Sequence, residues 1–171
     1  RSLTPEAIER IIVRGNPLLS QRTDRPNVTT GRESQVSTQH SVAAALIFGK
    51  AGLQEYTDAC VQDPRVLALR SRVAMEQDPA IPTESAIVRI FTRDGNEHAV
   101  TIDHAHGSLQ RPMTDRELEG KLRELAAPVL GEQKLLGLID AIWSLEKHDD
   151  ASKILPFVVP EQDGNSSRAR A

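Results

Sequence analysis

The sequence is poor in cysteine and in aromatic residues, and it has no long hydrophobic run. Cys60 is the only cysteine, so an intramolecular disulfide is impossible, and no Cys/His pair has zinc spacing. Aromatic residues make up 3%, which argues against a stacking platform for nucleic-acid bases. The longest apolar stretch, residues 42–48, is far shorter than the roughly 18 residues that would span a bilayer. We therefore expect a cytoplasmic protein with no metal, no nucleic-acid partner and no membrane segment.

The remaining composition is that of an ordinary globular chain. Of its 171 residues, 39% are hydrophobic and 26% are charged, and the formal net charge is -3. This charge argues against a nucleic acid or an anionic membrane as partner. The core must rest on aliphatic side chains. Because the chain begins with Arg1 and not with Met, we expect a processed chain or a fragment.

The first two thirds of the chain predict a mixture of strands and helices. Clusters of β-branched residues and turn residues place the strands, and apolar spacing with caps places the helices. The expected elements are a strand at 8–14, an irregular loop at 16–31, helices at 33–48 and 64–71, a strand at 72–76, and a hairpin at 86–93 and 97–103 across Asp94-Gly95. If the first two strands pair in parallel, the helices between them form a crossover.

The last third predicts helices. Thr114 and Glu117 have the spacing of a capping box, which starts a helix that ends near Pro128, and a further helix is expected at 132–146. The fold class is therefore α+β, a two-layer sandwich with about four strands and helices on one face. The expected parts are an α+β lid, residues 1–128, a closing helical segment, residues 129–159, and a polar, disordered tail, residues 160–171.

Three segments carry recognisable motifs. Residues 33–46 read ESQVSTQHSVAAAL, and residues 56–58 (YTD) are followed by residues 63–66 (DPRV). The third segment joins residues 107–108 (GS) to residues 111–122 (RPMTDRELEGKL). In order and spacing, the three resemble the C-terminal half of MmgE/PrpD proteins. The resemblance covers roughly residues 4 to 155.

The resemblance implies an enzyme part. The family includes 2-methylcitrate dehydratases, cis-aconitate decarboxylases and iminodisuccinate epimerases, which abstract a proton next to a carboxylate and need no nucleotide cofactor. Members combine a large all-helical domain with a smaller α+β lid, and they commonly form homodimers. The implied partners are a small polycarboxylate substrate, an N-terminal helical domain or subunit, and a second copy. The closing helices would pack on that helical domain, which this chain does not contain, so we expect the chain alone to be inactive.

The candidate site lies where the polar loop meets the following helix. We predict His40 and Ser37 as catalytic residues and Arg32 and Gln39 as substrate-binding residues. Histidine can transfer a proton, arginine offers a bidentate fork, and a serine in the first helical turn lies beside free N–H groups that favour anions. Each also has a structural alternative, as a capped histidine, a surface charge or a helix cap. In several family enzymes a histidine precedes the matching serine, whereas this chain has Val36 there and His40 where tyrosine is common.

A second hypothesis belongs to a different class. A small α+β sandwich can also serve as a non-catalytic binding or dimerisation module, because fold alone does not decide function. Val36 at the expected histidine position favours that alternative. A neighbouring gene for an all-helical partner would favour the enzyme part.

Overall fold

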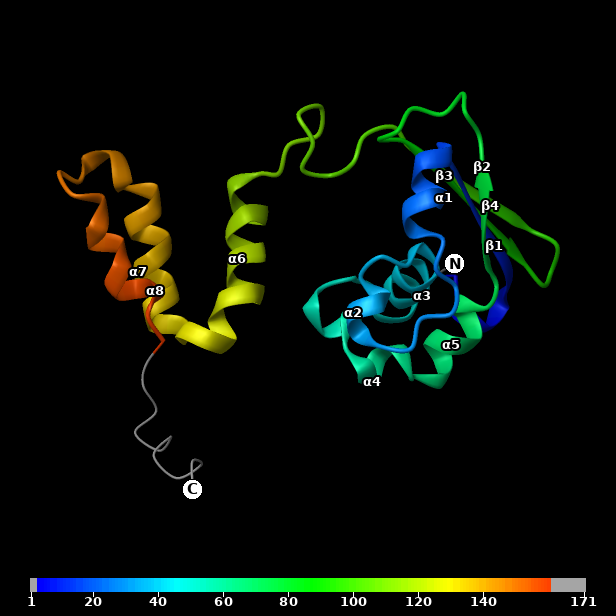
Figure 1. Cartoon of the computed structure of the whole chain (residues 1–171), viewed down its shortest axis with the longest axis horizontal. Helices are drawn as coiled ribbons and strands as arrows, with labels where there is room; N and C mark the ends of the chain where they lie inside the picture. The colour runs from blue at the N-terminus through cyan, green and yellow to red at the C-terminus, as the bar shows by residue number, and fades with distance from the viewer. Residues whose placement is uncertain (1–2, 161–171) are drawn as a thin grey trace, which may run out of the picture. The chain divides into compact units, whose positions relative to one another are not determined.

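The computed structural model describes residues 3–160, which belong to two compact units, Arg1–Arg111 and Pro112–Ala171 (Figure 1). The boundary between the two compact units lies after Arg111. The lid and the closing segment expected from the sequence, 1–128 and 129–159, are functional parts and stay a prediction. The expected disordered tail lies outside the described residues, apart from Pro160.

The first unit is built on a mixed sheet in the order β2-β1-β3-β4. The described strands are β1 (Ile8–Gly15), β2 (Val73–Gln77), β3 (Ala86–Thr92) and β4 (Glu97–Ile102). β1 pairs in parallel with β2 and antiparallel with β3, which in turn pairs antiparallel with β4. Gly95 has a φ of 83°, the left-handed conformation that the turn between β3 and β4 needs. The predicted hairpin is confirmed, and the first two strands pair in parallel, the condition on which the crossover depended.

The helices of the first unit cover one face of this sheet (Figure 1). They are α1 (Pro17–Thr23), α2 (Gly31–Ser34), α3 (Thr38–Phe48), α4 (Asp58–Val61) and α5 (Pro64–Arg70), with short 3-10 turns η1 (Pro5–Ala7) and η2 (Leu53–Tyr56). The core between the two layers is aliphatic. It contains Ile8, Ile11 and Val13 of β1, Ala43 and Ala44 of α3, Val66 and Leu69 of α5, Cys60 and Val73. The predicted two-layer α+β sandwich is confirmed.

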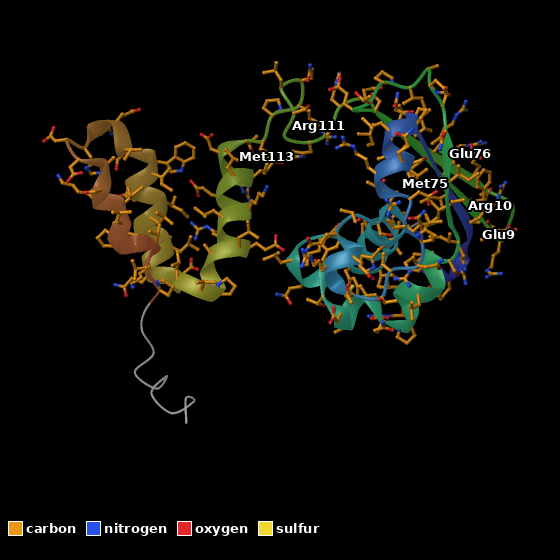
Figure 2. All side chains as sticks on the ribbon, in the orientation of Figure 1. Glu9, Arg10, Met75, Glu76, Arg111 and Met113 are labelled. Atoms are coloured by element: carbon orange, nitrogen blue, oxygen red, sulfur yellow. The ribbon has the colours of Figure 1, made fainter. Side chains whose placement is uncertain are left out.

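The opposite face of the sheet carries several charged side chains. Arg10 and Glu76 lie there (Figure 2), and the Arg10 guanidinium sits 3.9 Å from the centre of the Phe91 ring. Arg89 pairs with Glu97 across β3 and β4 at 2.7 Å. Cation–π contacts and cross-strand ion pairs of this kind let a sheet face remain in water.

Two expectations for the first unit were wrong in detail. The loop expected at 16–31 begins with helix α1, because Asn16 accepts a hydrogen bond from the backbone N of Leu18 and Pro17 occupies the first helical position. The helix expected at 33–48 is divided into α2 and α3. The division falls before Ser37, whose backbone is extended and whose side chain caps α3 by accepting from the N of His40.

The second unit is helical. It contains α6 (Asp115–Leu130), α7 (Glu132–Trp143) and α8 (Leu155–Val158), with 3-10 turns η3 (Leu145–Lys147) and η4 (Ala151–Ile154). The predicted capping box at the start of α6 is confirmed, since Thr114 N donates to Glu117 at 2.8 Å and Glu117 N donates back at 3.3 Å. Pro128 lies inside α6, which ends two residues later. The predicted helix at 132–146 stops at Trp143 and continues as a 3-10 turn.

The α6–α7 pair keeps an apolar surface in water. Trp143 donates from Nε1 to the Glu119 carboxylate at 2.8 Å, which joins the two helices at their polar edge. Leu118, Ile142 and Trp143 remain exposed. No helix among residues 3–160 is both long enough and apolar enough to cross a bilayer.

Candidate functional site

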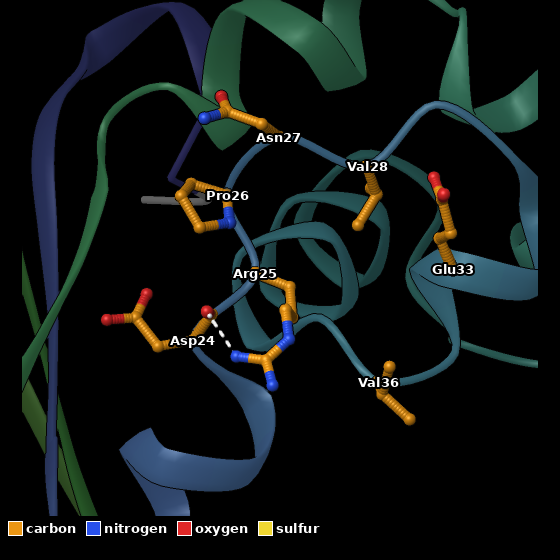
Figure 3. Close-up of a pocket in the computed structure, with 7 residues that line it drawn as sticks. All are labelled: Asp24, Arg25, Pro26, Asn27, Val28, Glu33 and Val36. Atoms are coloured by element: carbon orange, nitrogen blue, oxygen red, sulfur yellow. Dashed lines mark hydrogen bonds between the residues drawn. The ribbon is translucent and has the colours of Figure 1, made fainter.

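A pocket opens between the loop that follows α1 and the segment that joins α2 to α3 (Figure 3). Its volume is about 400 Å³. The lining residues, which we call the Arg25 pocket, are Asp24, Arg25, Pro26, Asn27, Val28, Glu33 and Val36. The pocket therefore combines a guanidinium, two carboxylates and an apolar wall.

The loop of this pocket is held by the first turn of α3. Ser37 donates from Oγ to the carbonyl oxygen of Arg25 at 2.6 Å. Gln39 accepts from the backbone N of Arg25 at 3.1 Å and donates through Nε2 to the carboxylate of Asp24. Both side chains are buried, with 1% of Ser37 and 2% of Gln39 exposed. These bonds orient the backbone on either side of Arg25.

Thr38 completes the arrangement. Its hydroxyl lies 2.7 Å from the hydroxyl of Thr23 at the end of α1, and Thr23 also donates to the carbonyl of Leu19. Three consecutive residues, 37–39, thus hold three consecutive residues, 23–25. We call this set of bonds the Ser37–Gln39 clasp.

Arg25 is the one cation that lines the pocket. Its Nη1 donates to the Asp24 carbonyl at 3.0 Å, which folds the side chain back across the opening (Figure 3). Within the described part of the chain, no carboxylate lies within ion-pair distance of this guanidinium. Pro26 restricts the backbone of the residue before it. The remaining guanidinium donors are free for an acidic ligand.

The carboxylate of Glu33 is occupied by its own helix start. It accepts from Thr29 N at 2.8 Å, from Thr29 Oγ1 at 2.9 Å and from Thr30 N at 3.2 Å. The backbone and hydroxyl donors of Thr29, followed by the backbone of Thr30, lower the pKa of Glu33. Glu33 therefore stays ionised and serves as the capping partner of Thr30.

The four site residues predicted from the sequence differ in burial and in their position relative to the Arg25 pocket. His40 is 0% exposed, its Nε2 lies 2.7 Å from the carbonyl oxygen of Glu55, and its Nδ1 has no hydrogen-bond partner among the residues described. The His40 and Tyr56 ring centres are 5.6 Å apart. Arg32 is exposed on α2. None of the four predicted residues lines the Arg25 pocket, although two of them bind its loop.

The sequence reasoning missed Arg25 and Asp24. The available signal was the long polar loop, because such loops in compact domains are often functional. Val36, where the resemblance led us to expect a histidine, is 52% exposed and lines the pocket. That position faces the candidate site.

No group of three or more His, Cys, Asp or Glu residues within the described ranges is arranged to hold a metal ion. Cys60 is a buried residue of α4, and its burial raises the pKa of the thiol. A thiol with a raised pKa is a poor nucleophile.

Comparisons with known proteins give one consistent family. Residues 1–146 match the family model described as the MmgE/PrpD C-terminal domain. The chain is 27% identical to cis-aconitate decarboxylase of Mus musculus over 157 residues, which is 89% of this chain and 32% of that protein. It is 26% identical to cis-aconitate decarboxylase of Homo sapiens over 97% of this chain and 36% of that protein.

A third relative matches over a shorter stretch. The chain is 37% identical to 2-methylcitrate dehydratase of Cupriavidus necator over 78 residues, which cover 46% of this chain and 14% of the relative. The chain thus spans about a third of the length of the two cis-aconitate decarboxylases that it matches. With the family match covering most of its residues, this chain belongs to the MmgE/PrpD family and carries its C-terminal domain.

Proposed function

We propose that this chain is the lid part of an enzyme that abstracts a proton next to a carboxylate of a small polycarboxylate. Loss of water, loss of CO2 or reprotonation then completes the dehydration, decarboxylation or epimerisation. The observation that carries the proposal is the Ser37–Gln39 clasp, because the segment with the family motif holds a loop that presents Arg25. The names of the relatives, cis-aconitate decarboxylase and 2-methylcitrate dehydratase, support acids of this class.

Within this proposal, His40 and Ser37 are the catalytic residues, and Arg32 and Gln39 bind the substrate. The bonds of His40 and Ser37 to backbone groups set a condition for such roles. The ring of His40 would reach a substrate only if the Glu55 segment moved, since Glu55 O now occupies Nε2. Hydrogen bonds of this kind often rearrange when a substrate binds.

The proposal requires a second wall for the cleft. An N-terminal all-helical domain, fused or separate, would supply it, and the exposed apolar surface of α6 and α7 supports a helical partner. Homodimer formation and a cytoplasmic location belong to the same proposal. No nucleotide cofactor is needed for proton abstraction of this kind.

The test is an activity assay on the 171-residue chain, alone and mixed with the helical domain of a family member. Proton NMR would follow cis-aconitate, 2-methylcitrate and iminodisuccinate. We expect no turnover by the chain alone and turnover of one acid by the pair. Turnover by the chain alone would contradict the need for a second wall. A pair that associates but converts none of the three acids would contradict the enzyme proposal.

The alternative is a non-catalytic binding or dimerisation module of the same family. Val36 favours it, because a valine in the pocket cannot transfer the proton that a histidine could. Sedimentation analysis, combined with the activity assay above, distinguishes the enzyme part from the binding or dimerisation module. A stable dimer of the chain that stays inactive with every helical partner would favour the module.

A further inference from the structure

We propose that the Arg25 pocket receives one carboxylate of a small acid together with the alkyl carbon beside it, and that the other carboxylates of the acid point out of the pocket. This inference rests on the proposed function and narrows its substrate class.

The first argument is the state of Arg25. Its guanidinium donates one hydrogen bond to the Asp24 carbonyl, and none of the described carboxylates forms an ion pair with it. A guanidinium binds carboxylates through two parallel hydrogen bonds, and the remaining donors allow that geometry. Arg22 lies three residues earlier on α1 and is exposed, but it does not line the pocket. Of these two arginines, only Arg25 lines the pocket.

The second argument is the charge of the lining. Arg25 is accompanied by the carboxylates of Asp24 and Glu33, so the lining has a net charge of one negative unit when all three are ionised. Like charges in a shared site repel. One carboxylate can sit on the guanidinium, but the net negative charge of the lining disfavours a second or third one inside the pocket. The charge count therefore sets the orientation of a polycarboxylate.

The third argument is the apolar wall. Val28 is buried in the loop, whereas half of Val36 is exposed toward the pocket, across from Arg25 (Figure 3). An alkyl group on the acid would cover Val36 and remove that apolar surface from water. The exposed Val36 side chain thus becomes a contact for the carbon skeleton.

The clasp fixes the backbone from which the Arg25 side chain extends. Ser37 and Gln39 hold the carbonyl and the N of Arg25, and Gln39 also holds the Asp24 carboxylate. Loop residues anchored on both sides lose little further freedom when a ligand binds, and this preorganisation favours affinity.

The experiment is a titration of the 15N-labelled 171-residue chain followed by NMR, with methylsuccinate and succinate as probes. We expect shifts confined to residues around 24–28 and 36, with methylsuccinate binding about threefold more tightly than succinate because of one buried methyl group. Shifts spread over the surface, or located in the second unit, would overturn the inference.

Four variants make the test specific. Arg25→Gln should weaken both probes roughly tenfold, whereas the matched control Arg22→Gln should leave them within about twofold. Asp24→Asn keeps an oxygen for Gln39 but removes a negative charge, so affinity should rise about threefold. Val36→Thr should abolish the preference for methylsuccinate over succinate and leave the affinity for succinate unchanged. A merely structural loop predicts no gain from Asp24→Asn, and an unchanged affinity in Arg25→Gln would overturn the inference.

Binding is measured without turnover, so the two proposals can fail separately. Shifts at the pocket in a chain that stays inactive with every helical partner would keep this inference and refute the enzyme proposal. Turnover by the assembled pair with an unchanged KM in Arg25→Gln would do the reverse.

Discussion

Gly31, the first residue of α2, is packed against the backbone that precedes α4. A methyl group built at this position would lie 2.2 Å from the carbonyl oxygen of Tyr56 and 2.9 Å from two backbone atoms of Thr57. The N of Gly31 also donates to the Asp58 carboxylate at 2.6 Å. Because the obstructing atoms are backbone, they cannot rotate away as a side chain would.

Two effects of Gly31→Ala have opposite signs. Helix propensity favours Ala over Gly by about 1 kcal/mol. Overpacking costs about 1–3 kcal/mol, and loss of the hydrogen bond to Asp58 costs about 1–2 kcal/mol more. We therefore expect the free energy of unfolding to fall by about 2–3 kcal/mol, a drop in Tm of roughly 10–15 °C for a unit of this size.

The matched control is Gly120→Ala in the middle of α6. Apart from the adjoining residues and the backbone of α6 itself, nothing lies within 4 Å of a methyl group there. Because only helix propensity changes at this position, Gly120→Ala should stabilise the second unit by about 1 kcal/mol. Trp143 is the only tryptophan and reports unfolding of the second unit by fluorescence, whereas amide hydrogen exchange of β1 reports the first.

The outcome decides between packing and propensity. If Gly31→Ala leaves exchange of β1 unchanged or slower, α2 does not lie against Tyr56 as described, and the reasoning fails. If both substitutions destabilise, propensity is not the governing term in α6.

The other predictions concern caps, charge and the buried histidine. Ser37→Ala should lower the free energy of unfolding by about 1–2 kcal/mol in urea titrations, through loss of the α3 cap and of the bond to the loop; an unshifted midpoint would refute the capping role. The Arg65 side chain holds the pKa of Asp63 at about 2. An Asp in the unfolded chain titrates near 3.9, so this stabilisation is complete above roughly pH 4 and is lost as pH falls toward 2. Asp63→Asn should flatten the dependence of Tm on pH in that window, and parallel curves would contradict the pairing. His40→Ala should cost about 2–4 kcal/mol by calorimetry, because it opens a buried cavity and leaves Glu55 O unpaired; lost turnover at unchanged Tm would instead favour the catalytic role.

The element types were predictable wherever short-range chemistry specifies them. The Thr114–Glu117 capping box and the Asp94-Gly95 turn each involve side chains within a few residues of the backbone that they serve. The break between helices α2 and α3, just before Ser37, was not predicted from the sequence, because the apolar pattern of residues 33–48 continues through it. There the side-chain cap of α3 overrode the pattern.

The candidate site was only half predictable. The family motif drew attention to Ser37 and Gln39, and their position at a helix start was correctly expected. The sequence did not predict which groups these two side chains would bind, because a serine at a helix start can cap the helix, bind a loop or contact a ligand. In the structure Ser37 does the first two, and the loop that it holds carries Arg25, a residue that no local pattern distinguished from Arg22.

By itself, then, the amino-acid sequence determined the α+β order of elements, the aliphatic core and the membership in a family, because these depend on composition, periodicity and short motifs. Only the tertiary structure decided which side chains meet. Arg25 and Gln39 are 14 residues apart, and their contact exists because α1 and α3 fold onto the same face of the sheet. Packing on that face also buried His40 and exposed Val36, which hydrophobicity alone would have placed the other way.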